Sequence, residues 1–220
     1  SPAAWRGALP LAYRLGPGPA RVRLKLQFDW RLQPVHDVIA VLPGGELPDE
    51  WIVRGNHHDA WVNGATDPVS GMVALLAEAK AIGALAKAGF RPRRTLVYAA
   101  WDGEEPGLLG ATEWAETHLG ELREKAVAYL NTDSVTRGFL QAAGSHSLER
   151  LVNEVGRSVL DPEHAVPVLE RTRAAGIANG DDKARERLRA KSDLRIGALG
   201  SGSDFTPFLQ HVGIASLNVD

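Results

Sequence analysis

The chain has 220 residues, a formal net charge of −2 and no cysteine. This near-neutral charge argues against a nucleic-acid-binding face, which would be strongly basic. The lack of cysteine excludes disulfides and thiolate chemistry and leaves the redox compartment open. The chain shows neither a signal peptide nor an apolar run of about 18 residues, so no membrane segment is predicted. Because it opens without Met, we expect it to be part of a longer protein.

In chain order, residues 1–20 are rich in Pro, Gly and Ala and are expected to form an irregular lead-in. Apolar and polar residues alternate over residues 21–30, which predicts a half-buried strand. We expect this strand to pair with the apolar run at 38–42 as an antiparallel edge. The clearest helix is predicted over residues 70–88, with Ser70 as its cap and Gly89 at its end.

Further helices are predicted at residues 108–122, 145–159 and 205–211, and a strand at 214–217. Residues 171–195 hold many charged residues without an apolar period, so we expect a long surface loop there. The alternation of strands and helices predicts an α/β fold. We expect a three-layer sandwich with a mixed, mostly parallel central sheet and helices on both faces.

Three predicted strands each run into metal-ligand side chains. The strand at 52–54 precedes His57 and Asp67, the strand at 95–100 precedes Glu104 and Glu105, and the strand at 126–130 precedes Asp133. Ligands of open α/β sheets bind outside the carboxyl ends of the strands. The pattern therefore indicates an active site at this edge of the sheet.

The chemistry of these residues suits zinc, which binds imidazole nitrogen and carboxylate oxygen. His57, Asp67, Glu105 and Asp133 supply one imidazole and three carboxylates, which favours two ions that share a bridging carboxylate. Adjacent residues cannot easily serve one ion in the same way, so Glu104 or Glu105 is free to act as general base on a metal-bound water. Each residue taken alone has an ordinary structural explanation, such as a turn, a helix start or an N-cap. Their joint occurrence at successive strand ends carries the prediction.

Five segments are specific enough to compare with known families: Gly55-Asn56-His57-His58-Asp59, Asp67-Pro68-Val69-Ser70-Gly71, Trp101-Asp102-Gly103-Glu104-Glu105, Asn131-Thr132-Asp133-Ser134 and Gly200-Ser201-Gly202-Ser203-Asp204-Phe205. Through these segments, and over nearly its whole length, the chain resembles the catalytic domain of the glutamate carboxypeptidase II and transferrin receptor family of zinc peptidases.

This resemblance implies two zinc ions and assigns roles by position. His57 and Asp133 would hold one ion, Glu105 the other, and Asp67 would bridge them. Glu104 would be the general base, and Asp59 would orient His57 through its second ring nitrogen. The substrate cleft would be lined by Ser201, Gly202 and Ser203. A cis peptide is expected between Asp67 and Pro68, because related peptidases use one at this place.

The chain also departs from the family pattern. A second-zinc His and a Tyr beside it would lie downstream of Asp220, so we expect a single catalytic domain with an incomplete second zinc site. His211 is a poor substitute for that His. The family's apical insertion and helical dimerisation domain are expected outside these residues, and the full-length protein is expected to be a homodimer.

Glutamate carboxypeptidase II recognises acidic residues through arginines, whose planar guanidinium groups bind carboxylates. The matching positions here are Ala143, Asn218 and Asp220. We therefore expect a two-zinc exopeptidase, acting as a carboxypeptidase or an aminopeptidase on a peptide substrate, that does not favour acidic residues. Two alternatives stay open: a non-catalytic binding module like the transferrin receptor, and a metal amidohydrolase acting on a non-peptide amide.

Overall fold

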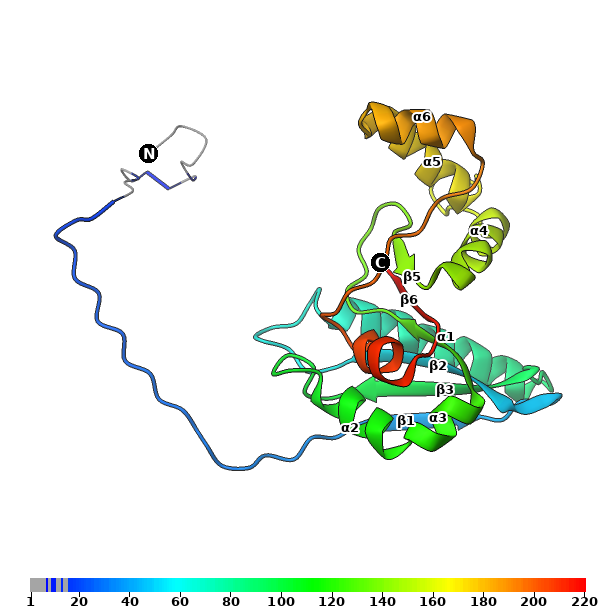
Figure 1. Ribbon diagram of the computed structural model, residues 1–220, viewed down its shortest axis with the longest axis horizontal. Coiled ribbons are helices and arrows are strands. Elements are labelled where there is room, and N and C mark those ends of the chain that lie inside the picture. The colour runs from blue at the N-terminus through cyan, green and yellow to red at the C-terminus, as the bar shows by residue number, and fades with distance from the viewer. Residues whose placement is uncertain (1–6, 8, 11–12, 14–15) are drawn as a thin grey trace. The chain divides into compact units, whose positions relative to one another are not determined.

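The structure is a computed structural model that describes residues 7, 9, 10, 13 and 16–220 (Figure 1). The chain divides into two compact units, Ser1–Gln33 and Pro34–Asp220. The described residues of the first unit form no helix and no strand. Much of the lead-in expected at residues 1–20 lies outside the described residues. The second unit holds the sheet and every described helix.

The prediction of a strand at residues 21–30 is wrong. This segment forms no ladder with any described residue. Its apolar side chains are exposed like its polar ones, since Val22 is 92% exposed and Trp30 is 87% exposed. Alternation alone does not make a strand, because the backbone N–H and C=O groups of a strand need a neighbour with which to pair.

A six-stranded sheet forms the centre of the second unit, with the strand order β1-β3-β2-β4-β6-β5. The inner strands β3, β2, β4 and β6 are parallel, whereas β1 and β5 pair antiparallel at the two edges. The sheet is therefore mixed and mostly parallel, as the sequence predicted. The strands are β1 Val38–Leu42, β2 Leu47–His57, β3 Arg94–Trp101, β4 Ala126–Asn131, β5 Ala142–Gly144 and β6 Ser216–Val219.

The partner predicted for β1 is wrong. Instead of the segment at residues 21–30, β1 pairs with β3, with Ile39 opposite Ala99. The two strands lie more than fifty residues apart in the chain, so a pattern within either of them cannot identify the other. The short strand β5 was not predicted at all. It forms because β6 offers it a free edge, where Ala143 lies opposite Asn218.

Helices lie on both faces of the sheet, which confirms the predicted sandwich (Figure 1). One face is covered by α1, and the other by α2, α3 and the π-helical turn η3. A buried core on the second face joins Trp101, Tyr129 and Phe208. The helical segments are α1 Val69–Lys87, α2 Leu109–Thr117, α3 Leu119–Lys125, η2 His146–Leu148, α4 Glu149–Ser158, α5 Val168–Asn179, α6 Asp182–Ala190 and η3 Pro207–Val212.

By length and composition, α1 could cross a membrane, with a mean hydropathy of 1.6 over its most apolar window. It nevertheless lies along the sheet, where it contacts β2 and β3. Glu78 on this helix pairs with Arg54 of β2 at 3.1 Å and accepts a hydrogen bond from Tyr98 of β3 at 3.0 Å. The expectation of no apolar run of about 18 residues is therefore wrong for α1, which is one weak candidate among the described residues.

Three predictions about helices need correction. Residues 171–195, expected to be a loop, instead hold most of α5 and all of α6. Leu188 packs against α5 at Gly176, and Asp181 caps α6 by accepting from the Ala184 N–H at 2.8 Å. The helix predicted at 108–122 is broken into α2 and α3 at His118. Ser70 does not cap α1. Its hydroxyl accepts from the Val135 N–H at 2.8 Å and so ties α1 to the loop after β4.

Candidate metal centre

The three ligand-bearing strands are neighbours in the sheet and end at the same edge. His57, the last residue of β2, lies opposite Trp101 at the end of β3, and Gly55 lies opposite Asn131 at the end of β4. The segments that follow β3 and β4 therefore start beside His57. They carry Glu104 and Asp133.

The loop between β2 and α1 brings Asp67 to the same place. Asn56 donates from its side-chain amide to the Pro68 carbonyl at 3.3 Å, and accepts from the Thr132 hydroxyl at 2.6 Å. This bridge ties the loop to the end of β4. The peptide bond between Asp67 and Pro68 is cis, which confirms the prediction.

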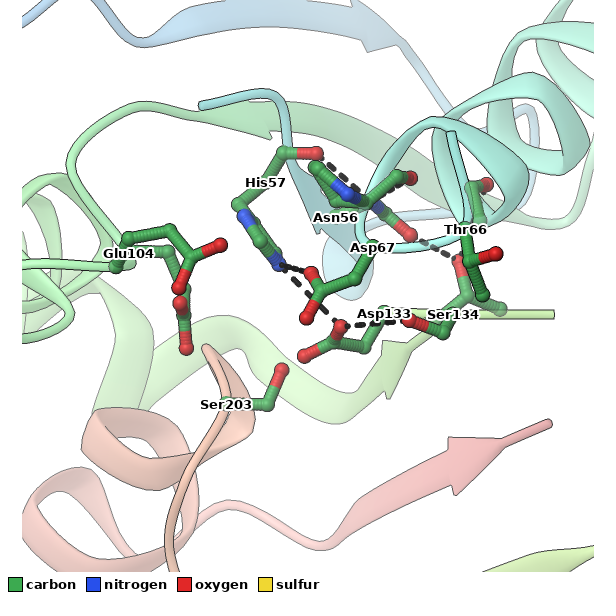
Figure 2. Close-up of polar contacts among 12 residues, drawn as sticks. Asn56, His57, Thr66, Asp67, Glu104, Asp133, Ser134 and Ser203 are labelled. Carbon is green, nitrogen blue, oxygen red and sulfur yellow. Dashed lines mark hydrogen bonds and ion pairs between the residues drawn. The ribbon is translucent and has the colours of Figure 1, made fainter. Parts of the chain in front are cut away.

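The ligand atoms have the spacing of a coordination site. His57 Nε2 lies 3.2 Å from Asp67 Oδ1 and 3.3 Å from Asp133 Oδ1 (Figure 2). Ligand atoms at the corners of a tetrahedron with zinc bonds of about 2.0 Å are about 3.3 Å apart. Glu104 belongs to the same group, since its ligand atom lies within 4.8 Å of those of His57 and Asp133. The residues present therefore fit a zinc ion.

The second ring nitrogen of His57 is held by the loop that follows β2. His57 Nδ1 lies 3.1 Å from the Asp59 carbonyl oxygen and 3.4 Å from Asp59 Oδ1. A carbonyl oxygen can only accept, so Nδ1 must carry the proton that is donated. In the neutral ring this tautomer leaves the Nε2 lone pair free and directed toward Asp67 and Asp133.

Charges at the centre shift the titration of its members. Burial by itself lowers the pKa of His57, but its hydrogen bond to Asp133 and the nearby carboxylates raise that pKa to about 9. Burial raises the pKa of Glu104 to about 7, and the charges of Asp133 and Glu105 add to the effect. Burial also acts to raise the pKa of Asp133, but hydrogen bonds from His57 and Ser203 hold it below its usual value.

The two adjacent glutamates have different surroundings. Their backbone N–H groups both donate to the Asp59 carboxylate, at 3.0 Å for Glu104 and 3.2 Å for Glu105. The Glu105 side chain accepts from the Trp61 N–H at 3.2 Å, whereas Glu104 groups with His57 and Asp133. Asp59 therefore positions the start of this segment as well as facing His57.

The expected substrate-cleft residues also differ among themselves. Ser201 and Gly202 are exposed, while Ser203 is buried and accepts from the Asn131 side-chain amide at 3.0 Å. His211 is exposed on η3 and belongs to neither of the ligand groups found among the described residues.

Asp204 is a site residue to which the sequence analysis gave no role. It is fully buried, and neither oxygen of its carboxylate has a hydrogen-bond partner among the described residues. Burial raises its pKa well above the usual range, and Glu104 and Asp133 add to this effect against the charge of His57. An unpaired buried carboxylate is costly, and a cation held by the neighbouring ligands would offset that cost. The one sequence signal was its place after the Gly-Ser turn at residues 200–203.

The chain is similar to known peptidases over most of its length. A family model described as Peptidase family M28 matches residues 37–219. "Probable glutamate carboxypeptidase VP8" from Zea mays is 40% identical over 220 residues, which are 99% of this chain and 29% of that protein. "Aminopeptidase NAALADL1" from Mus musculus is 34% identical, over 100% of this chain and 30% of that protein. The chain thus spans less than a third of these curated relatives.

Solved structures support the fold. The peptidase M28 precursor from Shewanella amazonensis SB2B has a TM-score of 0.53 and 22% identity, over 83% of this chain and 35% of that one. The resemblance to glutamate carboxypeptidase-like zinc peptidases is confirmed by the relatives named above. Because the family model covers most of the chain, including all three strand ends with their ligands, the chain belongs to peptidase family M28.

Proposed function

We propose that the full-length protein is a zinc exopeptidase in which Glu104 is the general base. One observation carries this proposal: His57 Nε2 lies 3.2 Å and 3.3 Å from Asp67 and Asp133, with Glu104 in the same group. The donors are one imidazole and several carboxylates, which is the ligand chemistry of catalytic zinc.

Two ions would share the site. His57, Asp67 and Asp133 would hold the first, while Asp67 and Glu105 would contribute to the second. Bound zinc would supply Lewis acidity toward a peptide carbonyl and a water, and two ions would share the charge of the two oxygens. His57 must lose the proton that its raised pKa favours before it can bind, so ion binding would release protons.

Proton transfer would fall to Glu104. Its carboxylate is half-buried and its pKa of about 7 lies near neutral pH, where a group can both take and return a proton. A carboxylate oxygen of Glu104 would accept the proton of the attacking water and deliver it to the leaving amine nitrogen. Asp59 would keep the backbone at Glu104 in place, because its carboxylate accepts from the Glu104 N–H at 3.0 Å.

The specificity proposal rests on one edge of the sheet. Ala143 lies opposite Asn218 in the β5–β6 ladder, and Asn218 donates from its side-chain amide to Asp220 at 2.8 Å. These three departures from the arginine pattern therefore lie together, and the amide and carboxylate already bind each other. An acidic substrate would find no guanidinium at these positions, so neutral or basic residues are favoured.

Assays on the full-length protein test the proposal. Chelation should abolish hydrolysis of neutral and basic dipeptides, and zinc should restore it. The value of kcat/KM for an N-acetyl-aspartyl-glutamate type substrate should be lower than for neutral dipeptides. Zinc binding without hydrolysis would favour the binding-module alternative, and cleavage of non-peptide amides alone would favour the amidohydrolase. A homodimer is expected for the full-length protein, and light scattering tests it.

A further inference from the structure

A series of buried polar side chains leads from the core of the sheet to the Asp133 ligand. The Trp101 indole N–H donates to the Tyr129 hydroxyl at 3.0 Å, and the Tyr129 hydroxyl donates to Asn131 Oδ1 at 2.9 Å. The Asn131 amide then donates to the Ser203 hydroxyl at 3.0 Å. Figure 2 shows the Ser203 hydroxyl directed toward the Asp133 carboxylate, and this hydroxyl helps to lower the pKa of Asp133. The first four residues are buried, with exposed fractions from 0% to 4%.

The direction of donation along this series is determined at its two ends. An indole N–H can only donate and an ionised carboxylate can only accept, so each hydroxyl between them receives one hydrogen bond and passes its own proton onward. Tyr129 accepts from Trp101 and therefore donates its own proton to Asn131. Ser203 accepts from Asn131, so its own proton is free to face Asp133.

A side branch orients the Asn131 amide in the same way. Asn218 gives its own N–H to the Asp220 carboxylate at 2.8 Å, so Asn218 Oδ1 must face Asn131. Asn131 donates to this oxygen at 2.8 Å as well as to Ser203. The Asn131 amide group thus donates to both Asn218 and Ser203, and the Asn131 side-chain oxygen accepts from Tyr129. If the Asn131 side-chain amide were rotated by 180°, its oxygen would face the Asn218 oxygen, and two acceptors would oppose each other.

The metal-binding strand makes room for this series. A Cβ atom at Gly55 would lie 2.1 Å from the Tyr129 hydroxyl oxygen and 2.5 Å from Trp101 Nε1. Gly55 is two residues before His57 on β2, so the strand that presents the imidazole passes directly over the start of the series. Any side chain at Gly55 would push the Trp101–Tyr129 pair away.

We propose that Asn131 and Ser203 are positioning residues of the metal centre, which orient the Asp133 carboxylate through the buried Trp101–Tyr129 pair. This rests on the proposed function, because it assigns Asp133 as a zinc ligand. Groups that hydrogen-bond a metal ligand from behind fix its orientation, and their loss typically costs about 10–100-fold in metal affinity. Polar groups linked in a series also strengthen one another.

The test measures the zinc dissociation constant of the full-length protein by competition with a chromogenic chelator. Ser203→Ala should weaken zinc binding by about 10–100-fold, and Ser203→Thr, which keeps the hydroxyl, should restore it. Tyr129→Phe touches no ligand and should still weaken binding, by about 10-fold. The matched control is Ser134→Ala, since the Ser134 hydroxyl lies 3.4 Å from the same carboxylate but outside the buried series. Its loss should be the smallest.

Thermal unfolding of the metal-free variants separates positioning from packing. If Ser203→Ala and Tyr129→Phe lower Tm but keep the wild-type zinc affinity, the series only stabilises the core and the inference is overturned. Should Ser203→Ala fail to fold, Tyr129→Phe decides alone. A wild-type protein that binds zinc and cleaves peptides leaves the proposed function intact whatever the variants do, whereas a wild-type protein without zinc affinity ends both.

Discussion

Two places in the second unit gather the same kinds of side chain, yet only one has the character of a metal site. His57, Glu104 and Asp133 form one group, and Asp161, Glu163 and His164 form the other. In each group one imidazole and two carboxylates bring their ligand atoms within 4.8 Å of one another. Their compositions are identical, so the difference must lie in what surrounds them.

The second group is neutralised by the protein itself. Arg171 pairs with Asp161 and, at 2.8 Å, with Glu163, and the N–H groups of Glu163 and His164 each donate to Asp161 at 3.0 Å. Burial acts to raise the pKa of Asp161, but these hydrogen bonds hold it at about 2. The Arg171 guanidinium is therefore the cation that compensates the carboxylates of this group.

The first group has no such partner. In the described part of the chain, no Arg or Lys hydrogen-bonds to His57, Asp67, Glu104 or Asp133, and Asp204 adds a buried carboxylate without a partner. The pKa values of His57 and Glu104 accordingly rise to about 9 and about 7. The comparison teaches that an uncompensated negative charge, rather than the residue types alone, distinguishes a centre that needs an ion.

The largest expected effect comes from removing the proton acceptor of the first group. Glu104→Gln keeps the shape of the side chain but cannot accept a proton. In the full-length protein kcat should fall by about 10²–10⁴-fold, while zinc content measured by metal analysis stays at the wild-type level. The control is Glu163→Gln in the second group, which should leave kcat unchanged. Near-normal turnover of Glu104→Gln would transfer the base role to Glu105.

The next largest effect is expected on stability, from a substitution that removes the Arg171 cation of the second group. Arg171→Leu leaves the buried Asp161 without its guanidinium, and an unpaired buried charge is strongly destabilising. Tm measured by calorimetry should fall by the same amount with and without zinc, because this group is separate from the proposed metal ligands. Arg150→Leu is a matched control, since its pair with Glu154 is exposed and worth little. Equal Tm values for the two variants would contradict the comparison.

Asp204→Asn tests the unpaired carboxylate in the first group. Burial raises the pKa of Asp204 well above its usual range, so keeping this carboxyl in the fold at neutral pH costs free energy. The variant removes this cost, and the free energy of unfolding of the metal-free protein should rise by on the order of 1 kcal/mol. Zinc affinity should fall at the same time, because one anion near the ion is lost. Chemical denaturation and chelator competition measure the two quantities. If both move in the same direction, Asp204 does not act as an anion of the metal centre.

The smallest expected effect is the pH dependence of the metal-free protein. The pKa of His57 is raised from 6.5 to about 9, so its stabilising contribution is full below pH 6.5 and is lost as the pH rises through 9. The raised pKa of Glu104 acts in the same direction between 4.5 and about 7. Tm should therefore decline from pH 4.5 to about pH 9, with the Glu104 contribution lost first and the His57 contribution last.

In the second group, stability is lost as the pH falls and not as it rises. Asp161 has a pKa of about 2 against its ordinary 3.8, so its stabilising contribution is present above pH 3.8 and is lost as the pH falls through 2. A His57→Gln variant should flatten the alkaline decline and leave the acid one in place. Thermal unfolding across the pH range, with a chelator present, measures both limbs, and an unchanged alkaline decline in this variant would rule out the assigned cause.

The inner strands and the place of the candidate site could be predicted from the amino-acid sequence. The runs at 52–54, 95–100 and 126–130 are apolar and β-prone, and they are confirmed within β2, β3 and β4. Since parallel strands end at one edge, the ligands that follow them had to meet there. Such signals are local: each lies within a few residues, and the rule that joins them is general.

The other features could not be predicted from the sequence, because they depend on contacts between residues far apart in the chain. The pairing of β1 with β3, the burial of Leu188 against α5, and the hydrogen bond between Asn131 and Ser203 each join such segments. Whether a cluster of carboxylates meets an arginine or stays unpaired is also a matter of packing. Arg171 reaches Asp161 from α5, a helix absent from the predictions, and Asp204 is left without a partner by the fold around it. Local patterns report which side chains are present, whereas long-range contacts decide which charges are compensated.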